Sequence, residues 1–240
     1  MNYLWVLFIL GTLILIHELG HFLAARAAGI PVELFSIGFG PALIKKSMGA
    51  TEYRISLIPL GGYVLPAVRD QDDYFHIPIW KRIAFALGGP AANLIATLVL
   101  FAILNIIHSG FTSTGVLVEP FRQTADIIRR IMLSLSELFT GNGSIMGIAG
   151  ILHQGGKYIG EDGTNAIKLA LMLSANLAVF NMLPLPVLDG GKIILCLLER
   201  ISVRLRAAYL PIMIFGWLLV IGVMVYATVM DAGRLLLSYS

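Results

Sequence analysis

The sequence predicts a helical membrane protein with about four transmembrane helices and a small membrane-associated β-sheet or hairpin after the first helix. Three observations predict this fold. Only 13% of the 240 residues are charged and 58% are hydrophobic, whereas roughly 25% of an average soluble domain is charged. Several apolar stretches reach about 20 residues, the length that crosses a bilayer core roughly 30 Å thick. One region instead alternates polar and apolar residues with the period of two that marks a strand.

Four apolar stretches are long enough to cross a bilayer. The first stays uncharged as far as Ile16 and continues through the polar group His17 to His21, and the other three contain no Asp, Glu, Lys or Arg. A secretory signal is the alternative for the first stretch, because Ala25-Arg26-Ala27 loosely matches a cleavage site. A signal opens with basic residues, however, and the first basic residue here is Arg26. We therefore expect spanning helices at about 3–28, 83–107, 169–188 and 207–230, all in one domain covering 1–240.

The positions of Lys and Arg predict how the chain crosses the membrane. Basic residues are dense between the first two spans and again after the third, and sparse in the longer segment 108–165. By the positive-inside bias, the first and third connections are cytoplasmic, and both termini and 108–165 lie outside. The sequence thus predicts a multi-pass protein of the cell membrane, the inner membrane in a bacterium. Topology explains the basic loops, so no nucleic-acid partner is expected. The single cysteine, Cys196, excludes a disulfide framework and a Cys-rich metal site.

Two extended segments follow the first span. Thr51 to Leu57 alternates polar and apolar residues, and Val32 to Phe39 is a second candidate strand that Gly40-Pro41 would end. Gly61-Gly62 is expected to turn the chain. We therefore expect a β region at about 32–65 against the cytoplasmic side of the helices.

The remaining connections carry weaker signals. Thr124 to Phe139 has apolar residues at helical spacing, which fits either a helix at the membrane interface or ordinary packing on the bundle. The glycine-rich segment 141–163 is expected to form loops. Asp70 to Tyr74 is an acidic turn, and a solvated loop histidine is the favoured interpretation of its neighbour His76, with a metal ligand as the alternative.

The strongest chemical pattern is His17-Glu18-Leu19-Gly20-His21. In this His-Glu-x-x-His arrangement the two histidines lie four residues apart on one helix face, so that both imidazoles can reach one ion. A charge left unpaired at the bilayer centre costs at least ~2.5 kcal/mol, so these side chains must face a polar cavity or a partner. The pattern therefore predicts a metal site within the membrane.

A catalytic zinc site usually takes three protein ligands, so a third must come from elsewhere. Asp189 is the one acidic residue at the edge of another span. Pro184 and Pro186 precede it and break the helix, and non-helical backbone at membrane depth persists only where it is buried or lines a cavity. The break lets this segment bend toward the first helix. The alternative is that Asp189 simply caps the helix that follows Gly190-Gly191.

These motifs and their order resemble the site-2 protease family of intramembrane metalloproteases over most of the chain. The likeness includes the His-Glu-x-x-His helix, the turn at Gly61-Gly62-Tyr63, the run from Gly88 to Asn93 and the run from Asn181 to Gly191. The resemblance implies that His17, His21 and Asp189 bind Zn²⁺, that Glu18 is the general base, and that Asn181 helps to hold the substrate. The run from Gly88 to Asn93 is expected to serve close helix packing.

The resemblance also implies the function. The chain is expected to be a zinc metalloendopeptidase that cuts within or near the transmembrane segment of a membrane-protein substrate, as in regulated intramembrane proteolysis. The expected substrate has a single span. Strands could hold the unwound substrate by strand addition. Many bacterial members carry a PDZ domain between the second and third spans, and 108–165 has no room for one. A metal-ion transporter and a non-catalytic membrane chaperone are the alternatives.

The sequence also predicts the depth of the site. Tyr3 to Ile16 precedes His17 on a helix that enters from outside, and it spans about 21 Å at roughly 1.5 Å per residue. Asp189 ends an apolar run that also starts outside. The active site is therefore expected toward the cytoplasmic side.

Overall fold

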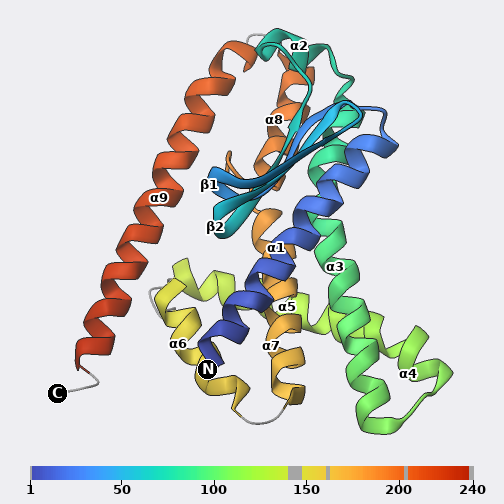
Figure 1. The fold of residues 1–240 in the computed structure, drawn as a ribbon, viewed down its shortest axis with the longest axis vertical. Helices are drawn as coiled ribbons and strands as arrows, with labels where there is room; N and C mark the ends of the chain where they lie inside the picture. The colour runs from blue at the N-terminus through green and yellow to red at the C-terminus, as the bar shows by residue number, and fades with distance from the viewer. Residues whose placement is uncertain (1, 140–147, 161–162, 203–204, 238–240) are drawn as a thin grey trace.

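The computed structural model describes residues 2–139, 148–160, 163–202 and 205–237 (Figure 1). In this part of the chain, four helices are long and apolar enough to cross a membrane. They are α1 (Asn2–Ala27), α3 (Ile79–Ser109), α7 (Gly163–Asn181) and the segment Arg206–Met230 of α9 (Leu205–Leu237). The predicted fold class is confirmed, and the chain is a multi-pass membrane protein. Figure 1 shows α9 set apart from the other three spans, with β1 and β2 drawn between it and α1.

Small residues bring α1 and α3 into close contact. A Cβ added to Gly20 would lie 2.6 Å from the Cβ of Ala92, and one added to Gly88 would lie 2.7 Å from the Cβ of Ala24. Neither position has room for a side chain, because the neighbouring atoms belong to a helix backbone or to its first side-chain carbon. The expected packing role of Gly88 is therefore confirmed, and this contact fixes how the His17-bearing helix faces α3.

The β region consists of two long antiparallel strands, β1 (Val32–Met48) and β2 (Thr51–Pro66). The expected breaks at Gly40-Pro41 and Gly61-Gly62 are wrong, since both strands continue through these residues with shifts of register. Glycine at 38 and 40 adopts positive φ, so the strand bends there without ending. The chain reverses instead at Gly49, which has φ of 64°.

The segment between the second and third spans is more helical than expected. It contains α4 (Ser113–Leu117), α5 (Glu119–Phe139) and α6 (Ile148–Ile159). The expected loop at 141–163 is wrong for α6 and for Gly163, which begins α7, whereas 141–147 and 161–162 lie outside the described residues. Gly155 and Gly156 are buried against α1: a Cβ on Gly156 would lie 2.8 Å from the Tyr3 ring. Glycine is abundant in α6 because the helix packs closely on α1.

The structure favours bundle packing over an interfacial role for the apolar face of α5. Ile131 forms a buried cluster with Ala175 and Val179 of α7. Asp126 and Arg129 lie on the exposed side of the helix. The acidic turn before the second span is likewise helical, forming α2 (Gln71–His76) with the side chain of Asp70 accepting a hydrogen bond at its N-cap.

The third spanning helix ends earlier than the apolar run that predicted it. Helix α7 stops at Asn181, and the following seven residues are non-helical because Pro184 and Pro186 cannot donate to helical hydrogen bonds. Helix α8 (Asp189–Ile201) then occupies what was expected to be a basic loop. Two of the basic residues used to infer topology are buried or partly buried partners of Glu199. Arg82 and Arg206 each place a guanidinium nitrogen 2.7 Å from a Glu199 carboxylate oxygen, which joins α3, α8 and α9.

Candidate metal centre

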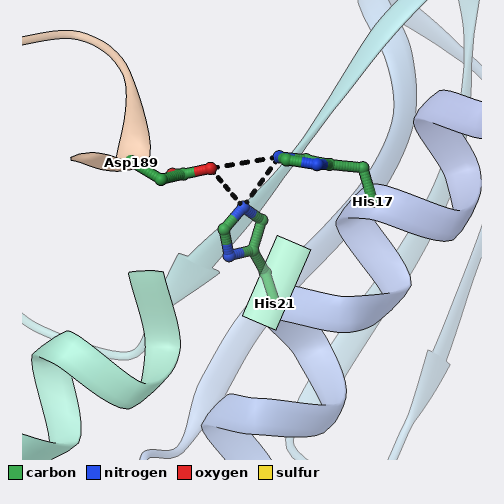
Figure 2. A group of neighbouring side chains, drawn as sticks. All are labelled: His17, His21 and Asp189. Carbon is green, nitrogen blue, oxygen red and sulfur yellow. Dashed lines mark hydrogen bonds and ion pairs between the residues drawn. The ribbon is translucent and has the colours of Figure 1, made fainter. Parts of the chain in front are cut away.

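His17, His21 and Asp189 converge at one buried point, although 172 residues separate His17 from Asp189. Figure 2 shows both imidazoles leaving α1 toward the carboxylate at the start of α8. The Nε2 atom of His17 lies 3.1 Å from Asp189 Oδ2, the Nε2 atom of His21 lies 3.2 Å from the same oxygen, and the two Nε2 atoms are 3.1 Å apart. All three side chains are buried.

This triangle fits a tetrahedral zinc ion. With bonds of about 2.0–2.1 Å, neighbouring ligand atoms around tetrahedral zinc are separated by roughly 3.3 Å. The three distances here are within a few tenths of an ångström of that value. Two imidazole nitrogens and one carboxylate oxygen are also a donor set typical of catalytic zinc, with a fourth position left for water. The residues present can therefore hold a zinc ion.

Gly89 of α3 provides the space beside the two histidines. A Cβ built on Gly89 would overlap Nε2 of His21 and of His17 and would lie 2.6 Å from Cε1 of His17. Gly89 is on a helix backbone, which cannot shift without disturbing the α1–α3 contact. Any larger residue at position 89 would therefore clash with the Nε2 atoms of both histidines.

Helix α3 also contacts the far nitrogens of both imidazoles. Nδ1 of His21 donates to the backbone carbonyl of Phe85, at 2.7 Å. Nδ1 of His17 lies 3.1 Å from the side-chain amide nitrogen of Asn93. A hydrogen bond at Nδ1 sets the ring orientation and the tautomer, so it decides whether Nε2 has a free electron pair for a metal. For His21, the Phe85 carbonyl can only accept. Its contact is shorter than the 3.3 Å between the Gly89 backbone nitrogen and the same Nδ1, which favours the proton on Nδ1 and leaves Nε2 free.

Asp189 is not a helix cap. It is the first residue of α8, and its predecessor Leu188 occupies the N-cap without a side-chain hydrogen bond. The Asp189 carboxylate faces the histidines through Oδ2 and the Lys192 ammonium through Oδ1, at 3.0 Å. The ammonium of Lys192 at this distance favours the charged carboxylate over the neutral acid. Asp189 is thus an anion, as a metal ligand must be.

The chain path around Asp189 depends on two glycines. Cβ atoms on Gly190 and Gly191 would overlap the backbone carbonyls of Met182 and Leu185 respectively. The first turn of α8 therefore packs directly on the non-helical segment. This contact explains why two glycines follow the aspartate.

Glu18 follows His17 in α1 and lies against the second strand. A Cβ on Gly62 of β2 would lie 2.7 Å from Cγ of Glu18. Glu18 is partly exposed, whereas His17 and His21 on either side of it are buried.

Sequence reasoning found the converging residues but missed their supports. His76 is exposed at the end of α2 and stands outside the cluster, as expected for a solvated histidine. Asn181 is the last residue of α7, and its role in holding substrate stays a prediction. The missed residues are Gly89, Asn93 and Lys192. Gly89 and Asn93 were read as helix packing and Lys192 as a loop charge, and spacing within α3 gives no sign of which α1 residues they would face.

Comparison with known proteins identifies the family. The sequence profile of peptidase family M50 matches residues 5–223. The chain belongs to peptidase family M50. The resemblance to the site-2 proteases is thereby confirmed, and in this M50 protein the match includes His17 and His21 of α1 and Asp189 of α8.

Individual relatives agree with this assignment. A Chlamydia trachomatis protein whose name describes a zinc metalloprotease is 49% identical over 112 residues, which is 40% of this M50 protein and 18% of the relative. The metalloprotease MmpA of Caulobacter vibrioides is 37% identical over 129 residues, which is 42% of this chain and 32% of the relative. The chain thus spans less than a third of the length of either protein in these matches.

One relative aligns from end to end. A Clostridium perfringens protein, also named for a zinc metalloprotease, is 26% identical over 330 aligned positions, which cover 96% of this chain and 98% of the relative. Since the alignment is longer than the 240 residues of this chain, the relative carries insertions that this M50 protein does not have.

Proposed function

We propose that the chain is an intramembrane zinc metalloprotease that hydrolyses a peptide bond within or near the transmembrane segment of a membrane-protein substrate. The observation that carries the proposal is the triangle of His17, His21 and Asp189, with ligand atoms 3.1–3.2 Å apart beside a spanning helix that also carries Glu18. Membership of a peptidase family and the names of the relatives support the same chemistry.

The proposed mechanism assigns each residue one task. His17 and His21 offer Nε2, and Asp189 offers Oδ2, to a zinc ion. A zinc ion held there supplies Lewis-acid polarisation of the scissile carbonyl and lowers the pKa of water to about 7. Glu18 accepts the proton of the attacking water and passes it to the leaving amine as the carbon–nitrogen bond breaks. Gly62 leaves room for the Glu18 side chain at the point where β2 crosses it.

The position of the strands supports a role in presenting substrate. A helical substrate hides its peptide bonds, so cleavage requires local unwinding and a partner for the freed backbone groups. Strand β2 passes over Glu18 at Gly62, so an extended segment paired alongside this sheet would lie next to the base. Asn181, at the end of α7, is proposed to contact the same segment.

A metal-ion transporter is less well supported. Transport would be expected to show several clusters of ligands along a path through the membrane. In the described residues, His17, His21 and Asp189 form the one group of three or more His, Cys, Asp or Glu side chains able to hold a metal. Transport also has no need of Glu18 beside the first histidine.

The test is cleavage of a single-span membrane protein by the purified full chain in detergent, with and without a zinc chelator. Glu18→Gln is expected to bind one zinc per chain and to cleave at least about 100-fold more slowly, because the amide cannot accept the water proton. Zinc content and turnover should therefore separate. Cleavage that survives both chelation and Glu18→Gln would contradict the proposal.

The proposed orientation places the site toward the cytoplasmic side of the membrane. Mass spectrometry of the products from a substrate of known orientation tests it. We expect the cut in the cytoplasmic half of the substrate span, since His17 follows about 21 Å of helix from the outer end of α1. A cut in the outer half would mean that the topology is inverted.

A further inference from the structure

Asn93 is the one side chain of α3 that contacts a proposed metal ligand through a polar group. It is fully buried, and its amide nitrogen Nδ2 lies 3.1 Å from Nδ1 of His17. Its carbonyl oxygen Oδ1 is buried without a hydrogen-bond partner. A buried polar atom without a hydrogen-bond partner destabilises the fold, so an unpaired amide oxygen next to a histidine calls for an explanation.

The backbone around Asn93 is held firmly in place. The hydroxyl groups of Thr97 and Ser174 each donate to the backbone carbonyl oxygen of Asn93, both at 2.9 Å. Thr97 and Ser174 are fully buried, and Ser174 belongs to α7, so the α3–α7 contact fixes this turn. The side chain of Asn93 therefore has little freedom except rotation of its terminal amide.

That rotation is coupled to the tautomer of His17. When the ring proton is on Nε2, it can be donated to Asp189 Oδ2 at 3.1 Å, and Nδ1 accepts from the Asn93 amide nitrogen. When the ring proton is on Nδ1, the facing Asn93 atom must be an acceptor, which requires a half-turn of the amide that brings Oδ1 to His17. Only the second arrangement leaves an electron pair on Nε2. Figure 2 shows that this nitrogen is the one directed at His21 and Asp189.

We propose that Asn93 is a positioning residue that holds His17 in the tautomer able to bind metal, by turning its amide so that Oδ1 accepts the Nδ1 proton. The inference rests on the proposed zinc site. It makes the two histidines unequal: the immobile Phe85 carbonyl determines the tautomer of His21, whereas an amide that can either donate or accept determines that of His17.

The experiment measures zinc affinity of the purified full chain by competition with a chromophoric chelator, so it does not depend on cleavage. Asn93→Leu keeps the side-chain volume and removes the acceptor, and we expect about 10- to 100-fold weaker zinc binding, the usual cost of losing a partner of a ligand histidine. Asn93→Asp keeps an acceptor that cannot donate, so zinc binding should be at least as tight as in the unchanged protein. Asn105→Leu is the matched control: it makes the same exchange on α3, removes hydrogen bonds with Gly115 and Gln123, and should leave zinc affinity unchanged.

The outcomes separate the inference from the proposed function. Unchanged affinity in Asn93→Leu, equal losses in Asn93→Leu and Asn93→Asp, or an equal loss in Asn105→Leu would each overturn the role of Asn93. If Asn93→Leu does not accumulate, Asn93→Asp decides, since weaker binding in that variant contradicts the proposal. Failure of the unchanged protein to bind zinc would instead overturn the proposed function.

Discussion

The two halves of the ligand set are held in different ways. His17 and His21 are one turn apart on α1, and both of their rings face α3, which supplies the Phe85 carbonyl, the Asn93 amide and the gap at Gly89. Asp189 instead lies beyond a non-helical segment and is paired with Lys192 on its own helix. The histidine half thus depends on the contact of two spanning helices, and the aspartate half on the path of a short, glycine-dependent connection.

The difference predicts where the site is most sensitive to added volume. Gly89→Ala should abolish zinc binding and cleavage, because the new Cβ would overlap Nε2 of both histidines. This is the largest effect we expect from a single methyl group. Zinc content after purification measures it, and Ala91→Val, at an exposed position two residues further along α3, is the control that should bind normally. One zinc per chain in Gly89→Ala would show that α3 lies farther from the site.

Removal of the aspartate tests the second half by itself. Asp189→Ala should lower both zinc content and activity, because it leaves only the two histidines where catalytic zinc usually has three protein ligands. Asp189→Asn, which keeps the shape and removes the charge, should also bind more weakly. Metal analysis decides the matter. Unchanged affinity in both variants would mean that the third ligand is another residue.

The ion pair behind the aspartate should matter least. Lys192 holds Asp189 Oδ1 at 3.0 Å, but its side chain is 30% exposed, and a partly exposed pair contributes about 1 kcal/mol or less. Lys192→Met should therefore weaken zinc binding by no more than about 5-fold, and Lys192→Arg should restore it. A loss as large as that expected for Asn93→Leu would show that Asp189 depends on its partner as strongly as His17 does.

Sequence patterns predicted the structure well wherever it depends on the spacing or type of residues that are close together in the chain. Four residues bring His17 and His21 onto one face in any helix, and two prolines interrupt any helix, so the histidine pair and the break before Asp189 were both predictable. Glycine was the residue most often misread. Gly155 and Gly156 are not loop residues: they lie in α6, where it packs closely against α1. Gly61 and Gly62 do not turn the chain, because β2 continues through them. The lack of a side chain in glycine serves turns and close packing equally, so composition alone cannot separate them.

The predicted topology depends on the total of the basic residues in each connection, whereas the structure shows which partner a single basic residue has. Lys192, Arg82 and Arg206 were counted in the predicted cytoplasmic connections. In the structure Lys192 pairs with Asp189, and the two arginines pair with Glu199. The remaining basic residues still favour the proposed orientation. The charge bias of a connection is a sum over many Lys and Arg residues, so it is unaffected by the pairing of a few of them. The partner of one residue instead depends on distances in the folded chain.

By itself, the sequence determined the class of fold, the helical histidine pair with Glu18, and Asp189 as the acidic residue able to join them. Each follows from hydrophobic length, helical period or the chemistry of a residue type, which act over a few neighbouring positions. Only the tertiary structure decided that Gly89 leaves the gap, that Asn93 faces His17, and that α8 folds back on the proline-broken segment. These facts depend on how far one helix is turned and shifted against another, and that geometry is set jointly by contacts between residues distant in the chain.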